Sequence, residues 1–267
     1  MSIQIDNNHA REIYCLEEIQ NILSAFQPIT LAEMDGVQLM NRTDTKFMFS
    51  YDQLKEILPD LASVYRVLEV EGVRQSRYQT LYFDTPTFSH FTQHQNGKRH
   101  RFKIRKREYI ESHLAFLEVK EKSNKGRTAK SRIKLPELTE TLDERGKKFV
   151  TSRAQYSEVL EPKLWNSFSR TTLVDTIAGE RVTIDTNISF TRGDQIVFLD
   201  GFVIAEVKQD GNNRHSRFIE HMKSRLIRPE GISKYCLGVA LHYPEIKSNT
   251  FKEKILKINK IVKHAII

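Results

Sequence analysis

The sequence predicts an α+β fold in which antiparallel strands form a β-barrel, closed or nearly closed, with helices packed outside it. Charged and apolar residues alternate along several segments, which is typical of strands with two unlike faces. Apolar residues at helical spacing mark segments near both ends of the chain. With 39% hydrophobic residues the chain can bury a core, and no repeat or Gly/Ser/Pro linker divides it, so we expect one domain over residues 1–267.

The first third of the chain mixes helices and strands. A helix is expected at about residues 10–26, where Ile, Leu and Phe recur at helical spacing until Pro28 stops the pattern. Strands are expected at 39–50 and 77–84, and a short helix rich in Leu and Ile at 51–62 separates them.

Three consecutive strands are expected in the middle of the chain, because cations occupy alternate positions in each while apolar residues lie between them. Alternate residues of a strand share a face, so the cations of each strand point the same way. The cations on these faces are Arg99, Arg101, Lys103, Arg105, Arg107, Lys120, Lys122, Lys130, Arg132 and Lys134.

The last part of the chain is expected to return from helices to strands. Helices are expected at about 138–150 and 155–168, followed by strands at 170–175 and 181–190.

A hairpin with its turn at Asp200-Gly201 is expected to join strands 196–199 and 202–208. Helices at about 214–226 and 251–265 complete the outline.

The positive charge of the chain is concentrated in one segment. The formal net charge is +8, and residues 98–134 alone contain 14 Lys and Arg against four Glu. Like charges opposite one another on neighbouring strands destabilise a sheet by about 0.2–1 kcal/mol a pair. A solvated sheet face is one explanation, but such a face normally mixes charges of both signs. Inside a barrel the same cations would instead attract a narrow, densely charged polyanion, and Arg suits bidentate contacts to phosphate.

Several other classes of protein are disfavoured. A surface for single-stranded nucleic acid would interleave aromatic residues with the cations, whereas the cationic face offers only Tyr109, at its end. No basic amphipathic helix indicates a membrane surface, and no run of about 18 apolar residues indicates a transmembrane helix. The polar N-terminus lacks the features of a signal peptide, and Cys15 and Cys236 form no disulfide framework, so a cytoplasmic location is expected.

An ordered set of short motifs resembles a known family. The set reads Arg42-x-x-x-Lys46-Phe47, Tyr82-Phe83-Asp84-Thr85-Pro86, Lys103-x-Arg105-x-Arg107-x-Tyr109, Leu117-Glu118-Val119-Lys120, Lys130-x-Arg132, Arg170-Thr171, Arg181-Val182-Thr183-Ile184-Asp185, Ala205-Glu206-Val207-Lys208 and Ser233-Lys234-Tyr235. It resembles the VTC domain, the catalytic domain of the vacuolar transporter chaperone polyphosphate polymerase and its bacterial relatives, within the triphosphate tunnel metalloenzyme superfamily. The resemblance covers roughly residues 39–243.

The resemblance implies a barrel that forms a tunnel, ATP as phosphoryl donor, Mn²⁺ or Mg²⁺ as cofactor and polyphosphate as product. By position, the metal ligand falls on Glu206, although this carboxylate could instead simply pair with Lys208 or an Arg. The tunnel cations of the family fall on Lys46, Arg105, Arg107, Lys120, Lys130, Arg170, Arg181, Lys208 and Lys234. Further substrate contacts are assigned to Arg42, Lys103, Lys122, Arg132 and Ser233, with solvent as the alternative for Lys103, Lys122 and Arg132. The chain departs from the family at Gly231, where a second lysine is expected one turn before Lys234.

Three functions remain as hypotheses, led by a polyphosphate polymerase that transfers the γ-phosphoryl group of ATP. The terminal phosphate of a growing chain is already ionised at neutral pH and requires no strong general base, whereas a hydrolase must activate water. A triphosphatase of the same fold is the first alternative, disfavoured because the segment 42–46 reads Arg-Thr-Asp-Thr-Lys where that branch has Glu-x-Glu-x-Lys. A polyanion-binding barrel without enzymatic activity is the second. Nucleic acid is not an expected partner, and any membrane partner protein is not indicated by the sequence.

Overall fold

A computed structural model describes residues 17–35, 42–124, 127–154, 158–210 and 215–262. Residues 17–24, at the start of the described chain, are helical. The strands are β1 (Pro28–Ile29), β2 (Arg42–Ser50), β3 (Arg66–Leu68), β4 (Ser76–Asp84), β5 (Arg101–Tyr109), β6 (Leu114–Lys122), β7 (Thr128–Leu135), β8 (Glu161–Asp175), β9 (Glu180–Arg192), β10 (Gln195–Leu199) and β11 (Phe202–Asp210). The helices are α2 (Leu31–Asp35), α3 (Tyr51–Leu61), α4 (Ser89–Gln95), α5 (Glu144–Ala154), α6 (Arg217–Ser224), α7 (Lys234–His242) and α8 (Lys252–Ile261), with a 3₁₀ turn η1 (Asn249–Phe251).

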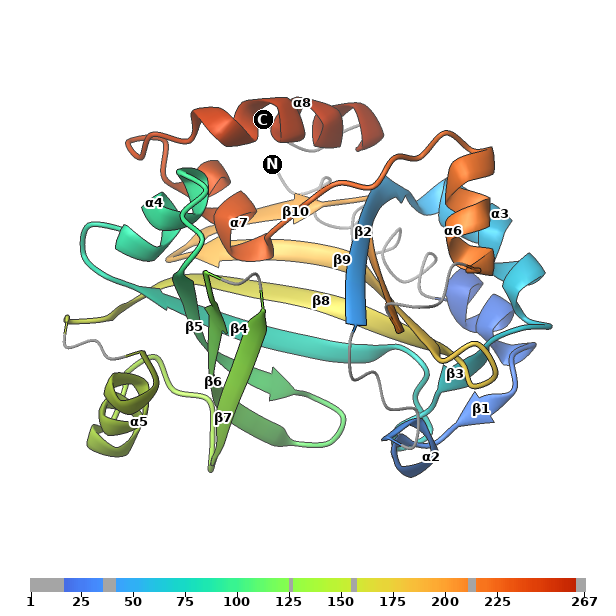
Figure 1. Ribbon diagram of the computed structural model, residues 1–267, viewed down its shortest axis with the longest axis horizontal. Helices are drawn as coiled ribbons and strands as arrows, with labels where there is room; N and C mark the ends of the chain where they lie inside the picture. The colour runs from blue at the N-terminus through green and yellow to red at the C-terminus, as the bar shows by residue number, and fades with distance from the viewer. Residues whose placement is uncertain (1–16, 36–41, 125–126, 155–157, 211–214, 263–267) are drawn as a thin grey trace, which may run out of the picture.

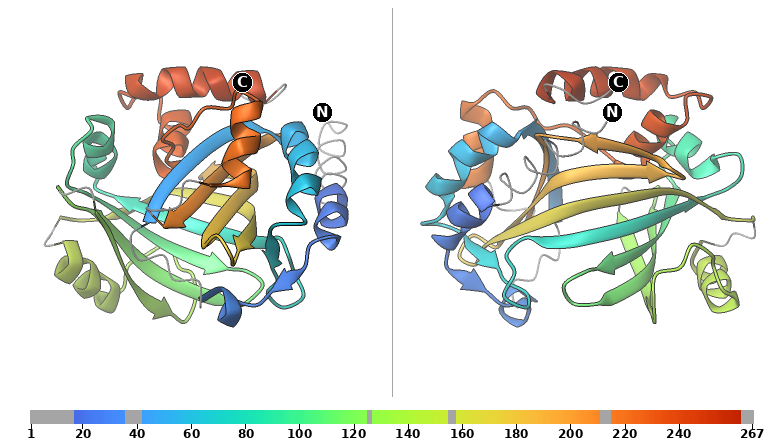
Figure 2. Two further views of the ribbon diagram at one scale, coloured as in Figure 1. Left: turned by 45° about the vertical axis from the view of Figure 1, so that its right-hand side comes forward. Right: turned by 180° about the vertical axis from the view of Figure 1, so that it is seen from behind.

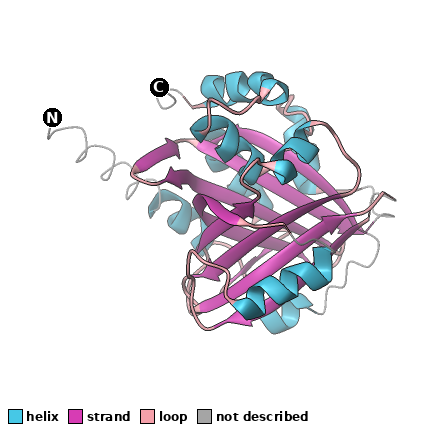
Figure 3. Cartoon of the chain, turned by 90° about the vertical axis from the view of Figure 1, so that its left-hand side faces the viewer, coloured by secondary structure: helices cyan, strands magenta, loops and turns pink. Residues whose placement is uncertain are grey.

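The strands form one curved sheet, and the fold is of the expected α+β class. Along the main path the order is β2-β11-β9-β8-β4-β5-β6-β7, and each pair of neighbours is antiparallel. The sheet curls around an interior, with the helices outside the layer of strands and at its ends (Figure 1, Figure 2, Figure 3). No pairing within the described ranges joins β2 to β7, so hydrogen bonds leave the barrel open between these two strands.

Two expectations for the strands are wrong. The helix expected at 155–168 is strand β8 from residue 161 onward, where Leu164, Asn166 and Phe168 are buried at alternate positions. Strands β10 and β11 do not pair with each other across Asp200-Gly201: β10 forms a hairpin with the end of β9, and β11 pairs with the first half of β9 along the same edge.

Gly201 explains why β10 and β11 are separate strands. Its φ of 70° is in the left-handed region, which interrupts an otherwise extended run. Its carbonyl accepts a hydrogen bond from the backbone N–H of Tyr51, at 2.8 Å. Because of this break, β11 continues along β9 while it also pairs with β2 on its other side.

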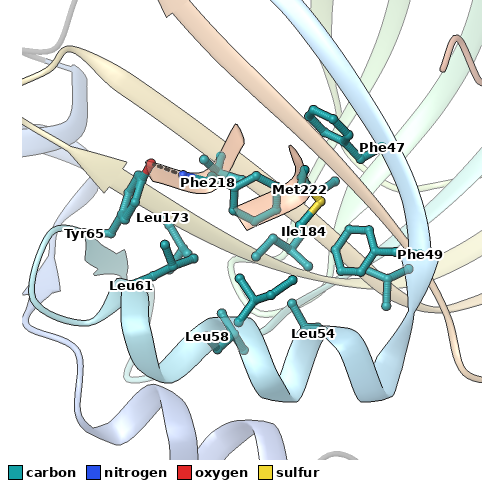
Figure 4. Packing of buried hydrophobic residues seen from close by; sticks show 14 of the residues in the cluster. Phe47, Phe49, Leu54, Leu58, Leu61, Tyr65, Leu173, Ile184, Phe218 and Met222 are labelled. Atoms are coloured by element: carbon teal, nitrogen blue, oxygen red, sulfur yellow. Dashed lines mark hydrogen bonds between the residues drawn. The ribbon is translucent and has the colours of Figure 1, made fainter. Parts of the chain in front are cut away.

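Two apolar clusters support the sheet from outside. Phe47, Phe49 and other residues of β2, β9 and β11 pack against helices α3 and α6 (Figure 4). Leu117, Val119 and their neighbours on β4 to β7 pack against Val150 of α5. Since Phe47 and Phe49 alternate with Lys46 and Met48 along β2, the latter two point to the interior of the curved sheet.

Helix α7 packs against the inner side of the sheet at one end. Its residues Tyr235, Leu237 and Val239 belong to one buried cluster with Met48 and Ile204, which alternate toward the interior. At Gly238 a Cβ atom would lie 2.2 Å from Leu164 Cδ2, so the helix approaches β8 too closely for any larger residue. No pattern in the sequence predicts α7. Its packing directs the N-terminus of the helix, and with it Lys234, toward the remaining interior space.

Candidate functional site: a cationic cavity inside the sheet

The interior of the sheet contains a cavity of about 620 Å³. Four carboxylates line it, Asp44, Glu111, Asp185 and Glu206. Eleven cationic side chains line it as well. They come from strands β2, β5, β6, β7, β8, β9 and β11 and from helix α7. They are Lys46, Lys103, Arg105, Arg107, Lys120, Lys130, Arg132, Arg170, Arg181, Lys208 and Lys234.

Asp185 of β9 lies between two of these cations. Arg170, opposite it in register on β8, donates two hydrogen bonds to its carboxylate, Nε to Oδ1 at 2.6 Å and Nη2 to Oδ2 at 2.8 Å. Lys234 donates to Oδ2 from the start of α7. Burial acts to raise the pKa of Asp185, but the charges of Arg170 and Lys234 outweigh it and hold the pKa far below its ordinary range. Asp185 therefore stays ionised and orients both cations.

Glu118 of β6 plays the same part on the other side of the cavity. It is 1% exposed, and it accepts from Arg105 at 2.6 Å and lies 2.6 Å from Lys130 Nζ. Burial acts to raise its pKa, but Arg105, Arg107 and Lys130 lower it to about 2. Glu118 does not line the cavity itself. It pairs with Arg105 and Lys130, which do, and it fixes their positions.

Glu206 of β11 is the carboxylate that the sequence assigned to a metal. Its Oε2 lies 3.0 Å from Lys208 Nζ, and its Oε1 lies 3.9 Å from Lys46 Nζ. Its burial is outweighed by Lys208 and Lys46, so its pKa is well below the ordinary value. An ionised carboxylate is the form that binds a divalent cation.

The donor set around Glu206 fits a metal that is held largely by its substrate. Within the described ranges, no three His, Cys, Asp or Glu side chains come together as a metal site. Asp44 lines the same cavity. It is in register with Lys208, two residues along the strands from the register pair Lys46 and Glu206. Mg²⁺ is often bound by one or two carboxylates together with substrate phosphates. Glu206, with Asp44 near it, could hold such an ion together with phosphate oxygens.

Two aromatic rings pack against Arg107 and Arg170 of the cavity. The rings of Tyr78 and Phe168 stack with centroids 5.0 Å apart, and the guanidinium groups of Arg107 and Arg170 lie 5.0–5.5 Å from these rings. Arg107 also donates to Thr80 Oγ1 at 3.1 Å. The sequence analysis missed these supporting residues, although alternation along β4 would have placed Tyr78 and Thr80 on one face.

Three lysines of the cavity have unusually low pKa values. Burial lowers the pKa of Lys103 to about 7, aided by Lys46 and Lys120. Burial together with Lys46 lowers the pKa of Lys120 to about 8. Burial also lowers the pKa of Lys234 to about 8, in spite of the opposing charge of Asp185. An anion in the cavity would favour the charged form of all three.

The segment before α7 contacts the lysines at one end of the cavity. Ser233 caps the helix through its side chain, and its Oγ accepts from Lys103 Nζ at 2.9 Å. The carbonyl oxygen of Ile232 accepts from Lys46 Nζ at 3.3 Å. These contacts hold two ammonium groups close to the N-terminus of α7, which itself favours anions.

The structure brings together nearly all residues that the sequence assigned to the site. Lys122 is the exception, since it is not among the residues that line the cavity. The backbone of Arg42 belongs to β2, but its side chain lies outside the described part of the chain. All the remaining cations assigned to the site, Ser233 and Glu206 line the cavity, whereas Arg99, Arg101 and Lys134 of the predicted cationic faces do not.

Comparisons with known proteins assign a family. Among solved structures, HpAC1 from Hippeastrum, reported with a dominant triphosphatase activity, is 15% identical with a TM-score of 0.46, over 75% of this chain and 96% of that one. PH1819 from Pyrococcus horikoshii OT3 is 12% identical with a TM-score of 0.42, over 74% of this chain and 98% of that one. No curated protein matches. In the described residues, no helix has the length and apolar character needed to span a membrane. The VTC domain matches residues 41–243, and the chain therefore belongs to the VTC domain family.

Proposed function

We propose that this protein is a metal-dependent polyphosphate polymerase, which transfers the γ-phosphoryl group of ATP to a growing polyphosphate chain inside the cavity. The observation that carries the proposal is the excess of eleven cations over four carboxylates around one cavity. Cations at this density would repel one another strongly unless a multiply charged anion lay among them. A phosphate chain is narrow, flexible and charged along its whole length, and so matches this cavity.

The pairing of the carboxylates supports transfer to a phosphate rather than to water. Asp185 and Glu118 are each held by two cations, and Glu206 is held by Lys208. Their lowered pKa values make all three weak proton acceptors. An ionised terminal phosphate attacks without losing a proton to a base, so this arrangement suits chain extension.

The residues of the chain have distinct roles in the proposal. Arg105, Arg107 and Arg170 bind the non-bridging oxygens, where charge must be neutralised during transfer. The lysines surround the chain and keep donor and acceptor phosphates in line. A bound Mn²⁺ or Mg²⁺ would neutralise further phosphate charge, and Glu206 and Asp44 are the residues that would hold it.

Incubation of the purified protein with ATP and Mn²⁺ tests the proposal. Long polyphosphate on a gel, with ADP in stoichiometric amount to the phosphate incorporated, is the expected result. Release of orthophosphate and ADP with no chain would support a triphosphatase instead. Salt-dependent binding of polyphosphate without any ATP turnover would support a binding protein.

A further inference from the structure

Three lysines lie directly opposite one another at one end of the cavity. Lys103 of β5 is in register with Lys120 of β6, and Lys120 is in register with Lys130 of β7. Like charges in such positions repel each other. No carboxylate stands in this row, although Lys130 contacts Glu118 in the neighbouring one. A bound anion would therefore relieve the repulsion among these three lysines.

A second row of cations continues beyond the cavity. Arg101 of β5 is in register with Lys122 of β6, and both lie on the faces that carry Lys103 and Lys120. Neither Arg101 nor Lys122 lines the cavity. The cationic face thus extends past the enclosed space, toward the exposed residue Lys98, whose carbonyl accepts from Arg101 at 2.7 Å.

Helix α8 brings a further cation to the same place. Lys254 donates from its ammonium group to the carbonyl oxygen of Gly231. Burial lowers the pKa of His94 to about 3, and Lys103, Arg101 and Lys254 all add to this effect. Their charges therefore act together at His94, from strand β5 and from helix α8, which are far apart in the sequence.

The other end of the cavity is less cationic. Leu68, Val70, Tyr109, Leu114 and Phe116 line it there, together with Glu111 and Ser112 of the turn between β5 and β6 and with Arg132, whose guanidinium lies 4.5 Å from the Phe116 ring. Tyr109 lies six residues from Lys103 on β5, which corresponds to about 20 Å along the strand. The cavity therefore has one end where apolar and charged residues mix and one end where three lysines form a row, and the cationic faces of β5 and β6 continue beyond the cavity from this row.

We infer that the polyphosphate chain leaves the cavity over the row Lys103, Lys120 and Lys130 and is bound outside it by Arg101 and Lys122. This exit site would bind only chains longer than a triphosphate, because a triphosphate is short enough to lie among the cations inside the cavity. Single-stranded RNA is a poorer occupant, because Phe102, the aromatic residue next to Arg101, is 9% exposed and faces the opposite side. The inference rests on the proposed function for the identity of the ligand.

Binding of preformed chains tests the exit site separately from catalysis. Affinities for tripolyphosphate and for polyphosphate of several tens of residues are measured by calorimetry, without ATP, for the wild type and for the double variant Arg101→Gln with Lys122→Gln. We expect the variant to lose about tenfold in affinity for the long chain and less than about twofold for tripolyphosphate, because only the long chain reaches the removed charges.

Two control variants test whether a loss of affinity comes from the change in net charge or from loss of the folded structure. Lys147→Gln with Arg217→Gln removes the same charge from exposed helix positions, whose ion pairs within the described ranges are to Glu144 of α5 and Glu220 of α6, and it should bind both ligands as the wild type does. Arg101→Lys with Lys122→Arg should keep the long-chain affinity. Equal losses for both ligands, no loss for either, or equal competition by single-stranded RNA would overturn the inference. A length-dependent loss in a protein that makes no polyphosphate would refute the polymerase and leave the exit site standing.

Discussion

The guanidinium group of Arg170 and the carboxylate of Asp185 form a two-bond ion pair across β8 and β9, with contacts of 2.6 and 2.8 Å. The carboxylate also accepts from Lys234, so one buried anion fixes two cations from different parts of the chain. This pair joins the wall of the sheet to the start of α7.

Asp185→Asn should destabilise the protein by about 3 kcal/mol, because two buried cations lose the charge that compensates them. The wild-type contribution of Asp185 is complete above the pKa of an unfolded Asp, near 4, and is lost as the pH falls below it, since the folded pKa is lowered. Denaturant unfolding at pH 7 measures the effect. Asp60→Asn, at a side chain that is 62% exposed, is the matched control and should change stability by less than about 0.5 kcal/mol. An Asp185 variant as stable as this control would show that the pair does not hold the site together.

Glu206→Gln should abolish metal-dependent turnover while binding of tripolyphosphate in the absence of metal persists or strengthens. The substitution removes the carboxylate proposed to hold the ion and frees Lys208 and Lys46 for the substrate. We expect a loss of about 100-fold or more in turnover, in the range of a missing electrostatic contribution to catalysis. Titration of activity with Mn²⁺ measures it, with Glu111→Gln as the control carboxylate of the same cavity. Turnover that survives at saturating metal would exclude Glu206 as the essential ligand.

Anion binding should take up protons between pH 7 and 9. Lys103, Lys120 and Lys234 have pKa values of about 7, 8 and 8, so part of their charge is missing in the free protein at these pH values, and a bound polyphosphate restores it. Calorimetry in buffers of different ionisation enthalpy should therefore detect uptake of about one proton or more per tripolyphosphate at pH 8. Lys103→Met should reduce the uptake. Binding with no linked proton would mean that these lysines are charged before the ligand arrives.

The stability of the free protein should change with pH in the opposite direction to its affinity. A lysine whose folded pKa is lowered binds fewer protons in the folded than in the unfolded state, so its contribution to stability rises with pH between the folded pKa and about 10.4. Thermal unfolding from pH 7 to 9 should show this rise for the wild type and a smaller one for Lys103→Met. A wild type whose stability falls steadily over this range would contradict the assignment.

Gly238→Ala should destabilise the protein by about 1–3 kcal/mol through overpacking between α7 and the sheet. The added Cβ would lie 2.2 Å from Leu164 and 2.6 Å from Phe190, both buried. Gly231→Ala is the control, because nothing lies within 4 Å of its Cβ position and its φ is not in the left-handed region. Equal stability of the two variants in denaturant unfolding would show that α7 is not held tightly against β8.

Alternation of charge predicted the strands that carry the cations, but it could not predict which cations meet. Arg105 and Lys120 could be assigned to the cationic face because a strand with one charged and one apolar face shows an alternation of residue types in its sequence. Arg170 and Lys234 meet at Asp185 through the register of β8 with β9 and the packing of α7, which no local pattern encodes. The first half of β8 was misread as a helix because apolar residues lie on both of its faces.

Helix α7 escaped prediction for a related reason. From Tyr235 to Val239 every residue is buried, so the helix has no polar face and therefore no helical period to detect. A turn is present at Asp200-Gly201, but the hairpin predicted there is wrong, because β10 and β11 each pair with β9 and not with each other. Strand pairing depends on β9, which is long enough to accept β10 and β11 one after the other.

Transfer of label from ATP distinguishes extension of a phosphate chain from hydrolysis. The protein is incubated with Mn²⁺, tripolyphosphate as acceptor and ATP labelled at the γ-phosphate, and products are separated by chain length. The account predicts label in chains longer than the acceptor and none from ATP labelled at the α-phosphate, because only the terminal phosphoryl group is transferred. Label found only in orthophosphate would contradict it.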